Sequence, residues 1–253
     1  MIFHIPHSST LIPEDQRQLL QFTESELAAE LLALTDHFTE ELFSPHAGPD
    51  DVALVFPVSR LVTDVERFSD DADETMSKVG MGAIYTHSSQ RKRFRLAPEP
   101  SERDALLNLY YVPHHQAFGE AVATQLEKDG TALIIDCHSF PSKALPYEPD
   151  QDPDRPVFCI GTDDFHTPKG LVEEIAHYLE SAGYSVKVNA PFAGSIVPMA
   201  YYGKNDHVHS LMLEINRALY MDETTGLKLG SFDEVKGCVE RVVSICRGFG
   251  DAQ

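Results

Sequence analysis

The sequence predicts an α/β fold in which helices cover both faces of a largely parallel sheet. Short apolar runs alternate with segments of helical periodicity along the chain, as expected when crossover helices join parallel strands. The run at 131–137 is short and mostly apolar, which is typical of a central strand buried on both faces. No internal repeat or long linker divides the 253 residues. We therefore expect one three-layer αβα domain spanning residues 1–253.

Short apolar runs that end at turn residues predict the strands. They lie at residues 2–6, 51–56, 59–65, 131–137, 157–161, 185–188 and 210–215. His7 directly follows the first run and His138 directly follows the fourth. Because ligands collect at the carboxyl ends of parallel strands, we expect both histidines at one rim of the sheet.

Segments with apolar residues at helical spacing predict the helices. They lie at residues 23–42, 101–109, 113–128, 168–182 and 232–246, the second and third forming two helices or one broken helix. Thr23 and Glu26 form a capping box at the start of the first helix, and Gly130 and Gly183 follow the ends of two others. The intervening segments predict loops, at 78–100, 141–155 and 191–203.

Composition disfavours several classes of protein. Twenty Lys and Arg against 40 Asp and Glu give a net charge of -20, which opposes binding to nucleic acid or an anionic membrane. No apolar stretch reaches the ~18 residues that a membrane helix needs, and the first residues do not resemble a signal peptide. We therefore expect a cytoplasmic location. The four cysteines form no CxxC pair and are expected to be reduced thiols. The oligomeric state stays open.

His7 and His138 are candidate metal ligands. They are far apart in the sequence, but a catalytic zinc needs only ligands that meet in space. Taken alone, each is better explained by a structural hydrogen bond to nearby backbone. Asp64 fits two roles, a strand-end cap or the partner that orients a metal-bound histidine.

Two further charged residues are candidates for catalysis or substrate binding. Arg67 offers a fork that matches a carboxylate, or else forms a surface salt bridge. Glu214 lies in an otherwise apolar run, where burial would raise its pKa as a general base requires. The alternative for Glu214 is a structural bond to Arg217.

Several short motifs, taken in order, resemble the N-formylglutamate amidohydrolase family. They are Ile5-Pro6-His7-Ser8-Ser9 with Ile12-Pro13, Ser59-Arg60 with Asp64-Val65-Glu66-Arg67, Tyr111-Val112-Pro113-His114-His115, Asp136-Cys137-His138-Ser139 and Glu214-Ile215-Asn216-Arg217. The resemblance spans residues 2 to about 222. It implies a zinc carboxypeptidase-like fold with a mixed, largely parallel sheet, one zinc ion, and hydrolysis of the amide of a small N-acyl amino acid.

The resemblance implies a metal centre built from distant residues. His7 and His138 would bind the zinc ion, and Asp64 would orient His7. Asp36, in Thr35-Asp36-His37 on the first predicted helix, resembles a Thr-Asp-x-His pattern of the family and is expected to be the third ligand, with Glu66 as the alternative. Beside Arg67, the negative charge of Glu66 would oppose an acidic substrate.

The resemblance also implies the groups that act on the substrate. Glu214 would be the general base, and Arg60 would stabilise the developing oxyanion. Substrate contacts are expected from Arg67, Ser139, Arg95 and Tyr201. Arg95 belongs to a basic run, 91–95, that could equally form a solvated loop face, and Tyr202 is an alternative to Tyr201. Other functions consistent with these residues are a metallocarboxypeptidase, a deacylase for another amide, and a non-catalytic acidic binding domain.

Overall fold

A computed structural model describes residues 1–250, so the last three residues of the predicted domain lie outside it. Six strands form one sheet in the order β2-β1-β3-β6-β4-β5. They are β1 (Ile2–Ile5), β2 (Val52–Val55), β3 (Ala132–Phe140), β4 (Phe158–Gly161), β5 (Val186–Val188) and β6 (Val208–Asn216). Neighbouring strands are parallel except β4 and β6, which confirms a mixed, mostly parallel sheet.

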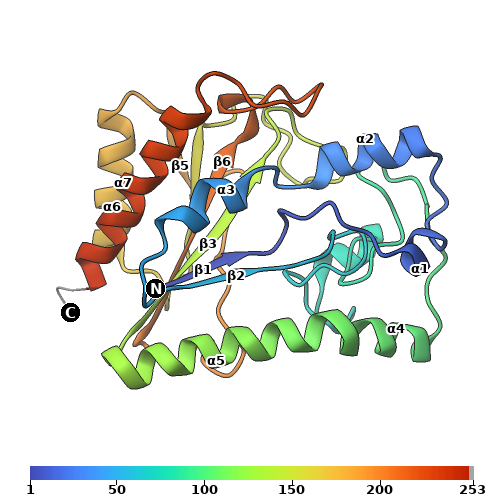
Figure 1. The fold of residues 1–253 in the computed structure, drawn as a ribbon, viewed down its shortest axis with the longest axis horizontal. Helices are drawn as coiled ribbons and strands as arrows, with labels where there is room; N and C mark the ends of the chain where they lie inside the picture. Colours follow the sequence, from blue (N-terminus) through green and yellow to red (C-terminus); the bar gives the residue numbers. More distant parts are fainter. Residues whose placement is uncertain (251–253) are drawn as a thin grey trace.

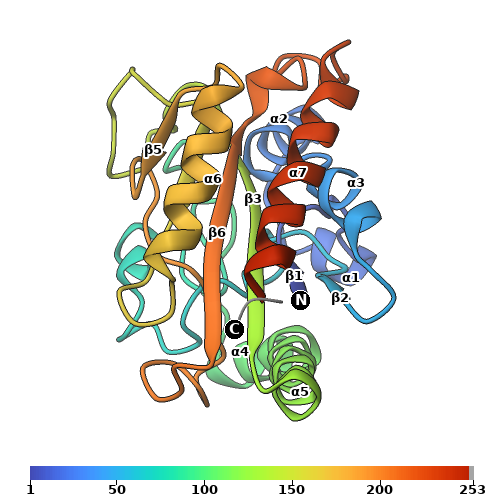
Figure 2. The ribbon, with the colours of Figure 1, turned by 90° about the vertical axis from the view of Figure 1, so that its left-hand side faces the viewer.

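Helices lie on both faces of this sheet (Figures 1 and 2). They are α1 (Glu14–Arg17), α2 (Glu24–Leu34), α3 (Thr39–Phe43), α4 (Pro100–Leu106), α5 (Val112–Asp129), α6 (Lys169–Ser181) and α7 (Phe232–Gly250). Short 3-10 helices occupy Ser44–His46, Thr75–Val79 and Arg217–Leu219, and a π-helical turn, Leu107–Tyr111, joins α4 to α5. α5 covers one face, and α3, α6 and α7 cover the other. Among the described helices, none has the length and apolarity to cross a membrane.

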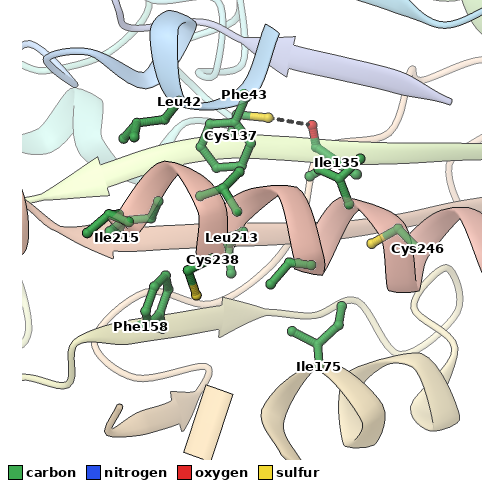
Figure 3. Packing of buried hydrophobic residues seen from close by; sticks show 14 of the residues in the cluster. Leu42, Phe43, Ile135, Cys137, Phe158, Ile175, Leu213, Ile215, Cys238 and Cys246 are labelled. Carbon is green, nitrogen blue, oxygen red and sulfur yellow. Dashed lines mark hydrogen bonds between the residues drawn. The ribbon is translucent and has the colours of Figure 1, made fainter. Parts of the chain in front are cut away.

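The core forms on both sides of β3, whose nine residues are all buried. Because successive side chains of a strand point to opposite faces, Ile135 and Cys137 pack with α7, as Figure 3 shows, while Ile134 packs with Phe118 of α5. Further along β3, the side of Ile134 carries polar residues, Asp136 and His138. The sheet face covered by α5 therefore changes from apolar to polar toward the carboxyl end of β3.

The prediction of one helix over 23–42 is wrong. The capping box of Thr23 is present, but α2 ends at Leu34 and α3 begins at Thr39. Between them the backbone N–H of Asp36 donates to the carbonyl of His7 at 2.9 Å, and Phe38 adopts a left-handed conformation with a φ of 66°. The hydrogen bond to the segment that follows β1 and the left-handed residue interrupt the helix, so Asp36 lies in a break between two helices.

The predicted strand at 59–65 is also wrong. The N–H of Val62 donates to the carbonyl of Ser59 at 2.8 Å, so the chain turns back there. The apolar residues of this segment are buried, but no strand pairing accompanies their burial within residues 1–250. His138 differs as well, since β3 continues to Phe140 and contains it. The remaining predicted strands and helices are present with small shifts at their ends, and all four cysteines are free and buried.

Candidate metal centre and adjoining cavity

His7, Asp36 and His138 come together at the polar end of the sheet. The Nδ1 atom of His138 lies 3.0 Å from Oδ2 of Asp36, and the Nδ1 atom of His7 lies 3.7 Å from the same oxygen. The two imidazole rings are 5.2 Å apart between centroids, and all three residues are buried. Their ligand atoms lie within 4.8 Å of one another. The fold thus brings together two histidines that are far apart in the sequence.

Each of the three residues comes from a different part of the fold. His7 follows β1, and His138 is within β3, which pairs with β1 in parallel. Asp36 lies in the break between α2 and α3, where its backbone is bonded to the carbonyl of His7. The strand pairing and this one backbone hydrogen bond therefore set the spacing of the group.

The donor atoms fit a divalent cation. His7 faces Oδ1 of Asp64 through Nε2 at 2.8 Å, and His138 faces Oδ1 of Asp136 through Nε2 at 3.0 Å. A proton on each Nε2 leaves both Nδ1 atoms with a lone pair directed at Asp36. The Nδ1 of His7 is buried and has no hydrogen-bond partner among the described residues. Two imidazole nitrogens and a carboxylate form a common zinc ligand set.

The surroundings of His138 stabilise positive charge. Burial alone would lower the pKa of His138, but Asp136, Asp36 and Glu66 together raise it well above its usual range. A buried cation is favourable only where carboxylates offset its loss of hydration. The same carboxylates would stabilise a metal ion bound to the histidines.

Asp64 connects His7 to two groups on the other side of the carboxylate. It accepts hydrogen bonds from Nη2 of Arg60 at 2.8 Å and from the hydroxyl of Tyr85. Burial would raise the pKa of Asp64, but the charges of Arg60, His7 and Arg67 hold it well below its usual range. Asp64 is therefore a fixed anion that orients His7. Tyr85 was not predicted from the sequence, where it resembles an ordinary core aromatic.

A second buried group lies beside the first and was not predicted. His4 of β1 faces Asp136 at 2.9 Å and Glu66 at 3.0 Å through its Nδ1 atom. Burial alone would lower the pKa of His4, but these two carboxylates raise it to about 9. Glu66 therefore belongs with His4 and Asp136, in a group that could itself hold a metal ion, and not with His7. No short motif marked His4, because it lies inside an apolar strand.

A cavity of about 280 Å³ opens onto the first group. Its lining includes Glu214, which pairs in register with His138 and therefore projects from the same face of the sheet. The Glu214 side chain is buried, and its Oε2 atom has no hydrogen-bond partner among residues 1–250. Burial raises the pKa of Glu214 to about 8. The cavity thus contains a carboxylate that can exchange a proton near neutral pH.

Three arginines line this cavity, and they differ in how they are bound. Arg217 donates to Asp36, Ser139 and the carbonyl of Ala33. Arg60 is held by Asp64 and Tyr85. The side chain of Arg67 makes no hydrogen bond with any described residue, and its Nε lies 3.7 Å from Asp64. Arg67 is therefore the guanidinium best able to bind an added carboxylate.

Of the remaining predicted substrate contacts, only Ser139 lines the first cavity. The hydroxyl of Ser139 already accepts a hydrogen bond from Arg217. Arg95 is buried outside the cavity, where its Nε donates to the carbonyl of Tyr85. Tyr201 packs against the apolar cluster beneath α5, whereas Tyr202 lines a neighbouring cavity. The sequence left Tyr201 and Tyr202 as alternatives, and neither of them lines the first cavity.

Comparison with known families gives a match over most of the chain. Residues 1–221 match the family model described as N-formylglutamate amidohydrolase. The N-formylglutamate deformylase of Pseudomonas aeruginosa is 29% identical over 241 residues, covering 88% of this chain and 82% of the relative. The N-formylglutamate deformylase of Pseudomonas putida is 30% identical over 131 residues, covering 51% of this chain and 48% of the relative.

Solved structures support the fold. The crystal structure of N-formylglutamate amidohydrolase from Ralstonia eutropha has a TM-score of 0.80 at 24% identity, with 98% of this chain and 94% of that chain covered. A gene product from Agrobacterium tumefaciens has a TM-score of 0.67 at 19% identity, with 98% and 90% covered. At these identities the likeness shows that the fold is shared.

Proposed function

The chain belongs to the N-formylglutamate amidohydrolase family, and we propose that it is a zinc-dependent hydrolase of the amide bond in N-acyl amino acids. The proposal includes the zinc carboxypeptidase-like fold and a small-molecule substrate of the N-formylglutamate type. It is supported by one feature above all. His7 Nδ1 and Glu214 Oε2 are two buried polar atoms without partners among the described residues, and both belong to residues lining one cavity.

In this proposal His7, Asp36 and His138 hold the metal ion. Two imidazoles and a carboxylate favour zinc over magnesium or calcium, which prefer oxygen ligands. When bound, zinc supplies a Lewis acid that polarises the scissile carbonyl and makes water more acidic. The Nε2 atoms would donate hydrogen bonds to Asp64 and Asp136, which would leave both Nδ1 atoms for the metal ion.

Glu214 acts as the general base. Its Oε2 accepts the proton of the attacking water and then returns it to the nitrogen of the leaving amine. A carboxylate with a pKa raised to about 8 is matched to this exchange, since it can gain and lose a proton near neutral pH. Water attacks directly, so the reaction needs no covalent intermediate with the protein.

Two arginines bind the charged parts of the substrate. Arg67, whose side chain has no hydrogen-bond partner in residues 1–250, holds the carboxylate of the amino acid and fixes its orientation. Arg60 lines the same cavity and already donates through Nε and Nη2. Its remaining Nη1 is the donor that we assign to the developing oxyanion.

Metal analysis combined with a substrate panel tests the proposal. Protein purified in chelator-free buffer is expected to contain one zinc ion per chain and to hydrolyse N-formyl and N-acetyl amino acids. Asp36→Asn should lower both zinc content and turnover. Asp51→Asn is the matched control, because Asp51 pairs with the N-terminus and Arg247 and is absent from the cavity lining.

The panel also includes dipeptides with a free carboxyl end. Faster cleavage of dipeptides than of N-formyl amino acids would replace the proposed activity with that of a metallocarboxypeptidase. Absence of both zinc and hydrolysis would leave a binding domain. Zinc that survives Asp36→Asn undiminished would remove Asp36 from the ligand set.

A further inference from the structure

A second cavity, of about 340 Å³, adjoins the one that contains the candidate metal centre. The two cavities share four lining residues, among them Arg67, Ala193 and Met212. The shared arginine therefore faces both spaces. The second cavity extends from it along the loop at 193–202, away from His7 and His138, which do not line it.

The walls of the second cavity are largely apolar at its opening. Phe68, Met199 and Tyr202 line it and remain 49%, 60% and 43% exposed. Ile196 and Val197 continue this lining from the same loop. Large apolar side chains exposed together around a concavity are typical of a binding surface, because exposure to water is otherwise unfavourable.

The second cavity offers no counter-ion for a second carboxylate. Arg67 is the sole arginine or lysine in its lining, and the lining also contains two acidic residues, Glu66 and Asp136. The two carboxylates already face buried histidines, so once Arg67 binds the α-carboxylate of the substrate, no arginine or lysine of this lining is left for an acidic side chain. The other arginines of the first cavity are already bound to Asp64 and Asp36. A second carboxylate bound there would therefore lose hydration without gaining a counter-ion.

We propose that the second cavity is the subsite for the amino-acid side chain of the substrate, and that it takes an apolar side chain. The inference rests on the proposed hydrolysis of N-acyl amino acids. It narrows this class to compounds with a single carboxylate and a large aliphatic or aromatic side chain, in place of the acidic side chain of N-formylglutamate. Connectivity supports this placement. The carboxylate and the side chain are attached to the same carbon, so a carboxylate on Arg67 brings the side chain to the junction of the two cavities.

The side-chain preference of the zinc-loaded protein tests this proposal. We expect kcat/KM for N-formylphenylalanine and N-formylleucine to exceed that for N-formylglutamate by roughly tenfold or more. Calorimetric binding of the same compounds to zinc-loaded Glu214→Gln protein measures the preference without turnover. A higher kcat/KM and tighter binding for N-formylglutamate would overturn the apolar subsite. Apolar preference in binding with no hydrolysis by the wild type would retain the subsite and reject the proposed activity.

Two variants locate the preference in the second cavity. Phe68→Ser and Met199→Ser should each lower the ratio of kcat/KM for N-formylphenylalanine to that for N-formylglycine by roughly fivefold to tenfold. Phe165→Ser is the matched control, because Phe165 is also 49% exposed and lines neither cavity. An unchanged ratio in both cavity variants, or an equal fall in the control, would place the side chain elsewhere.

Discussion

Two buried carboxyl groups, Asp64 and Glu214, have pKa values shifted in opposite directions because they have different partners. Asp64 accepts hydrogen bonds from Tyr85 and Arg60 and faces His7, so its pKa lies well below the usual range despite burial. Glu214 has one oxygen without a partner among the described residues, and burial raises its pKa to about 8. A carboxylate that stays ionised is suited to orient a metal ligand, whereas a carboxyl group that gains and loses a proton near neutral pH is suited to act as a base.

The first residue-scale prediction concerns Glu214. Glu214→Gln keeps the size of the side chain but cannot accept a proton, so kcat should fall by about 10²- to 10⁴-fold. Zinc content, measured by mass spectrometry of the purified variant, should stay at the wild-type level because Glu214 is not among the proposed ligands. A variant that turns over at the wild-type rate would exclude Glu214 as the base.

The second residue-scale prediction concerns Arg67. Arg67→Ala should raise KM for substrates with a free carboxylate far more than KM for the corresponding carboxamides, because only the carboxylate uses the guanidinium. Steady-state kinetics on matched acid and amide pairs provides the measurement. Arg241→Ala, at an exposed position on α7, is the control. Equal changes for acids and amides would show that Arg67 does not contact the carboxylate.

At the scale of elements, helical periodicity predicted α6 well because α6 packs along one uninterrupted face. Leu171, Ile175 and Leu179 are fully buried and recur every four residues, so they form one apolar stripe against β4 and α7. The segment from Thr23 to Leu42 has a similar pattern, yet it breaks at Asp36. A tertiary contact with His7, which periodicity does not contain, decides that break.

The buried stripe of α6 gives an element-scale prediction. Ile175→Ala removes fully buried methyl groups and should lower the free energy of unfolding by about 2–5 kcal/mol. Glu173→Ala, at an exposed position of the same helix, should change it by less than about 0.5 kcal/mol. Urea denaturation measures both values. Substrate turnover should be retained in both variants, since α6 contributes no residue to either cavity lining.

At the scale of the whole molecule, the fold holds the buried charges of the candidate site in place, and one of these charges lowers the stability of the folded protein. The sheet buries a network that runs from His4 through Asp136, His138, Asp36 and His7. Each buried charge in it is offset by an opposite charge nearby. Glu214 is the exception, because its ionised form is less favourable in the folded protein than in the unfolded chain.

This exception predicts how stability depends on pH in the metal-free protein. The Glu214 pKa rises from 4.5 to about 8 on folding, so the contribution of this group is fully present below pH 4.5 and is lost as the pH rises to about 8. Glu214→Gln should therefore match the wild type near pH 4.5 and melt several degrees higher at pH 8. Calorimetric scans after chelation provide the measurement, and a difference in Tm that does not change with pH would contradict the raised pKa.

The sequence by itself determined the alternation of strands and helices, the buried central strand, and the two histidines and Glu214 of the first cavity. These features follow from apolar periodicity and from short ordered motifs, both of which are local. Tertiary structure alone decided the break that positions Asp36, the pairing of Glu66 with His4, and the placement of Arg95 and Tyr201 outside the first cavity. The physical reason is that each depends on contacts between residues distant in sequence, whose free energies no local pattern encodes.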